Sequence, residues 1–126
     1  MAGRIEGKLE YTDRKKSLFY PRLYFALAVA GLLAHSGAAG LTLLILKVNI
    51  GMESNPLFYL MGGQAFLAFG VTGMLLYYFL LWRTSVPMGA KCVCASVLTA
   101  TAAFDFSHDL SFYLVKSFGL VLGIHV

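Results

Sequence analysis

The chain has 126 residues, of which 59% are hydrophobic and 13% charged, and its mean hydropathy is +0.75. A soluble domain, in which apolar residues make up roughly half of the composition, is excluded, and the sequence predicts a small integral membrane protein. The net charge of +4 does not indicate nucleic-acid binding, because six of the ten basic residues precede residue 23, where they act as a topology signal.

Residues 1–21 form a polar, basic leader. The first apolar run begins only at Leu23 and is about 24 residues long, which is too long and too late for a secretory signal peptide. We therefore predict a first membrane span over about 23–46, with Pro21 in the first turn of its helix. Its middle contains Gly31 and a run of small residues over 36–40, which would let a neighbouring helix approach closely.

A polar connection over 47–55 separates this span from the next. Asn55 and Pro56 have the residue types of a helix N-cap and first helical position, so the second helix is predicted to begin at Pro56. It is predicted to span 56–82, and the aromatic and basic residues at its end, Trp82 included, are typical of a membrane interface.

The remainder of the chain predicts a third span over 87–106 and a short segment over 110–126, which is either a fourth span or an amphipathic helix. The predicted fold is an all-α integral membrane bundle over residues 22–126, with four transmembrane helices, or three if the last segment does not cross. The basic leader and the basic turn after the second helix predict that the N-terminus lies on the cytoplasmic or an equivalent side.

Asp105, His108 and Asp109 are spaced at i, i+3 and i+4. If the third helix continues through them, they project from one face, and a carboxylate and imidazole cluster suits a transition metal or a proton relay. The alternative is that this helix ends near Phe106 and that the three side chains meet water.

Three more polar side chains, His35, Gln64 and Lys116, interrupt apolar segments, where they mark an ion path, a ligand site or a buried contact. His35 and Gln64 fall at nearly the same depth in the first and second helices, which predicts a hydrogen bond between them. Lys116 is predicted to lie at the depth of Asp105, so it either pairs with Asp105 or extends to the headgroups.

Residues 51–56 read GMESNP, a capped helix start with an acidic charge beside it. Gly51, Glu53, Asn55 and Pro56, with the helices on both sides, resemble a family of small prokaryotic multi-span membrane domains of unknown function, in which a Glu-x-Asn-Pro motif opens the second helix. The resemblance implies this architecture and a polar site between the first two helices, with Glu53 and Asn55 as candidates. It implies no reaction.

Three functions fit these features. The favoured one is an accessory or assembly subunit of a larger membrane complex, whose polar membrane residues contact partner helices. The alternative is a small homo-oligomeric transporter or channel whose path is lined by the candidate residues. An intramembrane enzyme or metal site is least favoured, because no recognised catalytic motif is present. The expected partners are the lipid bilayer and other membrane subunits or further copies; no cofactor is identified.

Overall fold

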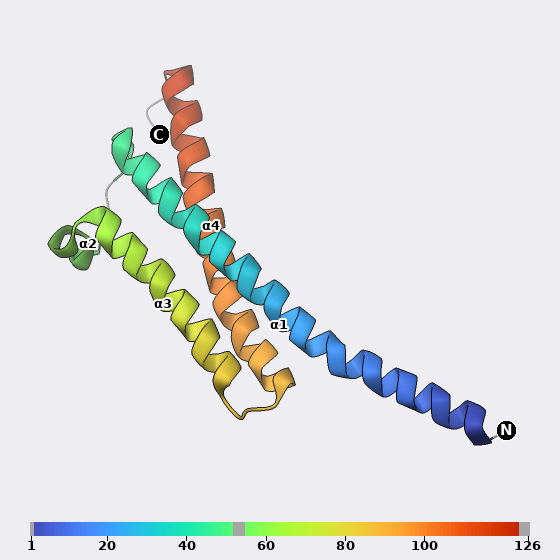
Figure 1. Cartoon of the computed structure of the whole chain (residues 1–126). Coiled ribbons are helices and arrows are strands. Elements are labelled where there is room, and N and C mark those ends of the chain that lie inside the picture. The colour runs from blue at the N-terminus through green and yellow to red at the C-terminus, as the bar shows by residue number, and fades with distance from the viewer. Residues whose placement is uncertain (1, 52–54, 124–126) are drawn as a thin grey trace.

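The computed structural model describes residues 2–51 and 55–123, with side chains described at residue 7 and from residue 17 onward within these ranges. The described chain is mostly helical, contains no strand, and consists of α1 (Ala2–Lys47), α2 (Pro56–Met61), α3 (Gly63–Arg83) and α4 (Met88–Leu122), as Figure 1 shows. The predicted all-α class is therefore confirmed.

Three segments of the described chain are long and apolar enough to cross a membrane: Ser17–Lys47, Gly63–Arg83 and Met88–Leu122. They fit a multi-pass integral membrane protein and correspond to the three-helix alternative. The predicted separation of 87–106 from 110–126 is wrong, because α4 continues through residues 107–109. These residues are polar but include neither glycine nor proline, so nothing in the backbone ends the helix there.

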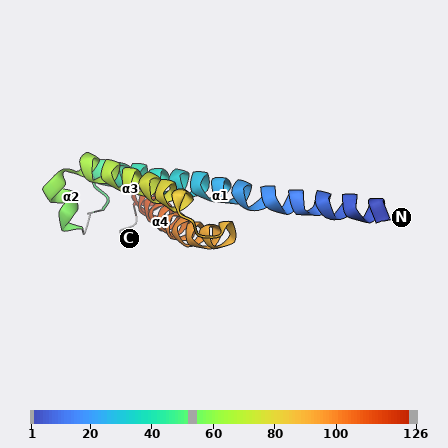
Figure 2. The same cartoon turned by 60° about the horizontal axis from the view of Figure 1, so that its bottom comes forward.

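The helix that holds the first span also begins earlier than predicted. α1 starts at Ala2, and Pro21 lies inside it rather than in its first turn. At 1.5 Å per residue its 46 residues extend about 69 Å, and the N-terminal part runs well past the other helices (Figures 1 and 2). The predicted leader is therefore helical.

The predicted second helix is divided at Gly62. This glycine has φ +83°, a left-handed conformation that a glycine adopts without a Cβ clash, and it separates the short α2 from α3. The predicted start of α2 is confirmed: Asn55 is the N-cap, and its Oδ1 accepts a 3.0 Å hydrogen bond from the Leu57 backbone N–H.

α1 and α4 cross and make the most extensive contact in the structure, whereas α3 packs mainly along α1 and touches α4 only slightly. Small residues of α1 permit the crossing. A Cβ on Gly37 would lie 2.8 Å from the Phe106 ring, and Ala38 is buried. The main core lies where the three long helices meet and consists of Tyr24, Met74, Tyr78, Cys92, Ala95 and Ala102.

Hydroxyl groups join the three helices within this core. The Tyr24 hydroxyl donates to the Tyr78 carbonyl at 2.6 Å, and the Thr99 hydroxyl donates to the Leu27 carbonyl at 2.9 Å. Since the Thr99 proton is used in that bond, the Tyr78 hydroxyl is the donor in its 2.9 Å contact with Thr99 Oγ1. We call Tyr24, Tyr78 and Thr99 the hydroxyl network.

Lys91, at the start of α4, is only 6% exposed. Its ammonium group donates a 2.6 Å hydrogen bond to the Trp82 carbonyl and lies 5.8 Å from the centre of the Trp82 ring. The last carbonyls of a helix have no partner within that helix, so Lys91 caps the end of α3.

Candidate functional site

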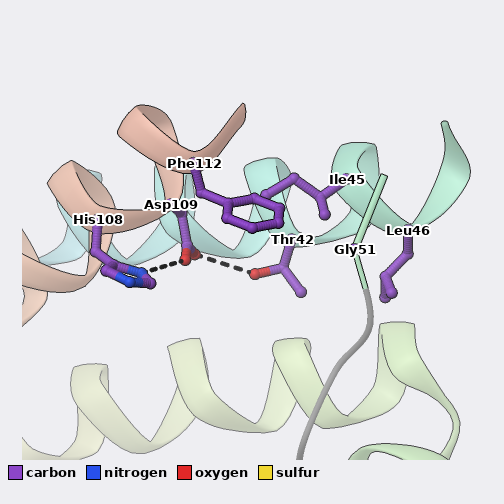
Figure 3. A pocket seen from close by; sticks show the side chains of 7 residues that line it. All are labelled: Thr42, Ile45, Leu46, Gly51, His108, Asp109 and Phe112. Carbon is purple, nitrogen blue, oxygen red and sulfur yellow. Dashed lines mark hydrogen bonds and ion pairs between the residues drawn. The ribbon is translucent and has the colours of Figure 1, made fainter. Parts of the chain in front are cut away.

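The C-terminal end of α1 lies at the end of the molecule opposite the α3–α4 turn (Figure 1). A pocket lies there between α1 and α4 (Figure 3). Its volume is about 150 Å³. We call it the end pocket, and Figure 3 shows its seven lining residues: Thr42, Ile45 and Leu46 of α1, Gly51 of the following connection, and His108, Asp109 and Phe112 of α4.

Asp109 holds the polar groups of the end pocket together. Its Oδ2 accepts a 3.2 Å hydrogen bond from the Thr42 hydroxyl, and its Oδ1 lies 3.5 Å from Nδ1 of His108 (Figure 3). The Asp109 side chain is 28% exposed, whereas the His108 side chain is 70% exposed. Among residues 17–51 and 55–123, whose side chains are described, no lysine or arginine pairs with Asp109. In that part of the chain, its carboxylate faces the pocket with the Thr42 hydroxyl and the His108 imidazole as partners.

Gly51 closes one side of the end pocket at a place where no side chain fits. A Cβ there would lie 2.8 Å from Cγ2 of Ile45 and 2.9 Å from Cε1 of Phe112. The first residue of the GMESNP string thus packs against both α1 and α4. Glu53 of the same string lies outside the described residues. Asn55 caps α2 and does not line the pocket.

A second, more open hollow of about 290 Å³ adjoins the end pocket and shares His108 and Phe112 with it. Lys116, one turn after Phe112, lines this hollow and holds its ammonium group 5.8 Å from the centre of the Phe112 ring. The flank of α4 therefore carries a carboxylate on one side of Phe112 and an ammonium group on the other.

The predicted cluster on α4 is present only as a pair. Because the helix continues past Phe106, the alternative in which it ends there is wrong, and Asp105, His108 and Asp109 all lie on α4. Asp105 is exposed, however, and does not line the end pocket. In the part of the chain that is described, no three His, Cys, Asp or Glu side chains lie close enough together to hold a metal ion.

The predicted hydrogen bond between His35 and Gln64 is wrong. His35 faces Gly70, where a Cβ would lie 2.9 Å from its Nε2. Gln64 is exposed and lies six residues, or about 9 Å, nearer to the start of α3 than Gly70. The expected depth of Gln64 assumes one continuous helix over 56–82, whereas the break at Gly62 separates α2 from α3.

The predicted ion pair between Asp105 and Lys116 is also wrong. Both residues lie on α4, eleven positions and about 16 Å apart along its axis, which is too far for contact. The pairing depended on a turn between them, and that turn does not exist.

No sequence pattern points to Thr42 or Phe112, because a threonine and a phenylalanine are ordinary residues of a membrane helix. Comparison with protein-family models, with curated proteins and with solved structures found no match. The resemblance to the Glu-x-Asn-Pro membrane domains therefore stays a prediction.

Proposed function

We propose that the protein is an accessory or assembly subunit of a larger membrane complex, and that the last turns of α4 contact the partner subunit. The observation that supports this is the length of α4. Its 35 residues extend about 52 Å, and even at a tilt of about 40° they rise about 40 Å, against a hydrocarbon core of roughly 30 Å.

About 10 Å of α4 therefore has to lie at or beyond the headgroups. If the start of α4 lies at one membrane boundary, the projecting part is its C-terminal end, where the large residues are apolar. Phe118 is 67% exposed and Val121 is 84% exposed. Neither water nor lipid headgroups favour such a surface, and in the described chain no other helix covers it, so contact with another membrane subunit accounts for it.

The hydroxyl network also fits this function. Its side chains bond to one another and to backbone within the bundle, so they brace the three helices against one another. A homo-oligomeric transporter has less support, because three residues of the predicted path, His35, Gln64 and Asp105, line neither of the two pockets described above. Of the other path residues, His108 and Lys116 line these pockets, and Glu53 lies outside the described residues.

A photo-reactive residue tests the proposal. p-Benzoylphenylalanine is placed at Val121, with a matched variant at Phe104, which is also strongly exposed at 71% but lies in the middle of α4. In native membranes, position 121 is expected to cross-link to one discrete protein, and position 104 to lipid only. The native mass of the unmodified protein in mild detergent should exceed that of the free chain by the mass of this partner.

Two results would contradict the accessory role. One is a free chain in detergent with no protein cross-link from position 121. The other is a cross-link from position 121 to a second copy only, with the native mass of a homo-oligomer, which would favour the transporter alternative.

A further inference from the structure

We propose that the end pocket binds a primary ammonium group, carried by a phosphatidylethanolamine headgroup or by a small soluble amine. The ammonium group would sit against the Asp109 carboxylate. This site is separate from the terminal turns of α4, so the inference does not depend on the proposed function.

The end pocket carries a carboxylate whose charge favours a cation. The Asp109 carboxylate is partly buried, and its partners in the described chain are the Thr42 hydroxyl and the His108 imidazole. Of the seven described residues that line the pocket, only His108 can carry a positive charge, so a neutral imidazole would leave the Asp109 charge unbalanced by any of them. A carboxylate has about four acceptor positions, so the hydroxyl and the imidazole leave acceptor capacity for a donor cation. A primary ammonium group supplies both the charge and three N–H donors.

The remaining walls fit the carbon atoms next to such a group. Ile45, Leu46 and Phe112 are apolar, and an aromatic ring also attracts a nearby cation. The volume of about 150 Å³ equals that of a cavity known to hold benzene, so it accommodates a ligand of about six non-hydrogen atoms. Ethanolammonium and short alkylammonium ions are within this size.

The position of the pocket along the helices brings it to the headgroups. Asp109 lies 21 residues, or about 32 Å, after the start of α4 at Met88. Thr42 lies 20 residues, or about 30 Å, after Arg22 on α1. Against a hydrocarbon core of roughly 30 Å, these distances place the pocket at the boundary opposite Arg22 if the helices stand upright, and within about 7 Å of it at a tilt of about 40°. The adjoining hollow brings Lys116 to the same boundary, where it would meet the phosphate of a bound lipid.

Two binding measurements on the full chain distinguish the sources of the ammonium group. In the first, the protein in dodecyl maltoside is titrated calorimetrically with isobutylamine hydrochloride, with isobutanol as the neutral control. In the second, the protein is placed in nanodiscs of equal parts phosphatidylethanolamine and phosphatidylcholine, and the retained lipid is identified by native mass spectrometry. Phosphatidylcholine has a quaternary ammonium group with no N–H donor.

The matched variants are Asp109→Asn, which removes the charge and keeps an acceptor for Thr42, and Asp105→Asn, which makes the same change one turn away outside the pocket. We expect binding in at least one measurement, lowered about tenfold or more by Asp109→Asn and unchanged by Asp105→Asn. Retention of phosphatidylethanolamine without isobutylamine binding identifies a lipid headgroup as the ligand. Isobutylamine binding without preferential retention of phosphatidylethanolamine identifies a soluble amine.

The inference is overturned if the wild type neither binds isobutylamine more tightly than isobutanol nor prefers phosphatidylethanolamine. It is also overturned if Asp109→Asn binds as the wild type does. If Asp109→Asn does not fold, Leu46→Trp serves in its place, because it fills the pocket and leaves the carboxylate intact; undiminished binding to that variant would place the ligand elsewhere.

Discussion

Gly31 of α1 lies where the three long helices meet, and its replacement by alanine tests the packing of the core. The added Cβ would collide with the hydroxyl of Tyr78 and would lie 3.0 Å from Oγ1 of Thr99 and 3.2 Å from Cε of Met74. Two of these neighbours belong to the hydroxyl network. Gly31→Ala therefore has to separate α1 from α3 and α4 or displace the Tyr78 hydroxyl from Thr99.

The expected cost follows from three contributions. Extra methyl groups in a packed core cost about 1–3 kcal/mol. Loss of the Tyr78–Thr99 hydrogen bond adds about 0.6 kcal/mol, the average for such bonds in membranes. Alanine recovers about 1 kcal/mol through its higher helix propensity. The net loss in the free energy of unfolding is therefore about 0.5–2.5 kcal/mol.

Gly40→Ala is the matched control, because Gly40 is on the same helix and a Cβ there has no neighbour within 4 Å. Both variants gain the same helix propensity, so that contribution cancels, and Gly31→Ala should be less stable than Gly40→Ala by about 1.5–3.5 kcal/mol. The assay is equilibrium unfolding in dodecyl maltoside micelles with increasing SDS, followed by helical circular dichroism. Equal stability of the two variants would refute the close approach of the helices at Gly31.

Three further substitutions test other contacts. Tyr78→Phe removes one hydroxyl of the network and should lower the free energy of unfolding by about 0.5–1.5 kcal/mol in the same assay. Lys91→Met leaves the Trp82 carbonyl uncapped, so it should cost about 1–3 kcal/mol and change the fluorescence of Trp82, the one tryptophan of the chain. Gly70→Ala should force the His35 ring out of its rotamer at a cost of about 0.5–1.5 kcal/mol, visible as a shift of its ¹⁵N resonances.

Each of these variants has a control that changes the same residue type elsewhere. Tyr77→Phe is the control for Tyr78→Phe and changes an exposed tyrosine. Lys47→Met is the control for Lys91→Met and changes an exposed lysine at the end of α1. Gly73→Ala is the control for Gly70→Ala and changes a glycine of α3 with open space at its Cβ position. If a control has the same stability and spectrum as the variant it is paired with, the contact that this pair tests is contradicted.

Features that depend on local sequence could be predicted. The apolar runs located the long helices, and Asn55 followed by Pro56 located the start of α2, because capping depends on neighbouring residues. The small residues of α1 indicated a close helix contact, and Gly31 and Gly37 lie in one. Gly40 belongs to the same run of small residues but has no neighbour at its Cβ position, because a small residue permits a helix contact without creating one.

Features that depend on how helices are placed in space could not be predicted. Whether polar residues 107–109 form a turn or a helix depends on what surrounds them, and hydropathy alone favoured a turn. The break at Gly62 depends on a positive φ, and other glycines of the same helices have no such conformation. The end pocket forms because Asp109 and Thr42 lie side by side although they are 67 positions apart in the chain. No local sequence pattern indicates such a pairing.

The hydroxyl network also determines which alignment of the helices is allowed. A slip of α1 by one position would turn Tyr24 away from the Tyr78 carbonyl and the Leu27 carbonyl away from Thr99 together, because successive side chains on a helix point about 100° apart. In hydrocarbon no water replaces the lost partner of a hydroxyl, so each hydroxyl left without a hydrogen bond would destabilise the slipped arrangement by several kcal/mol. Apolar side chains tolerate many sliding arrangements, and these three hydroxyls discriminate among them while the chain is folding.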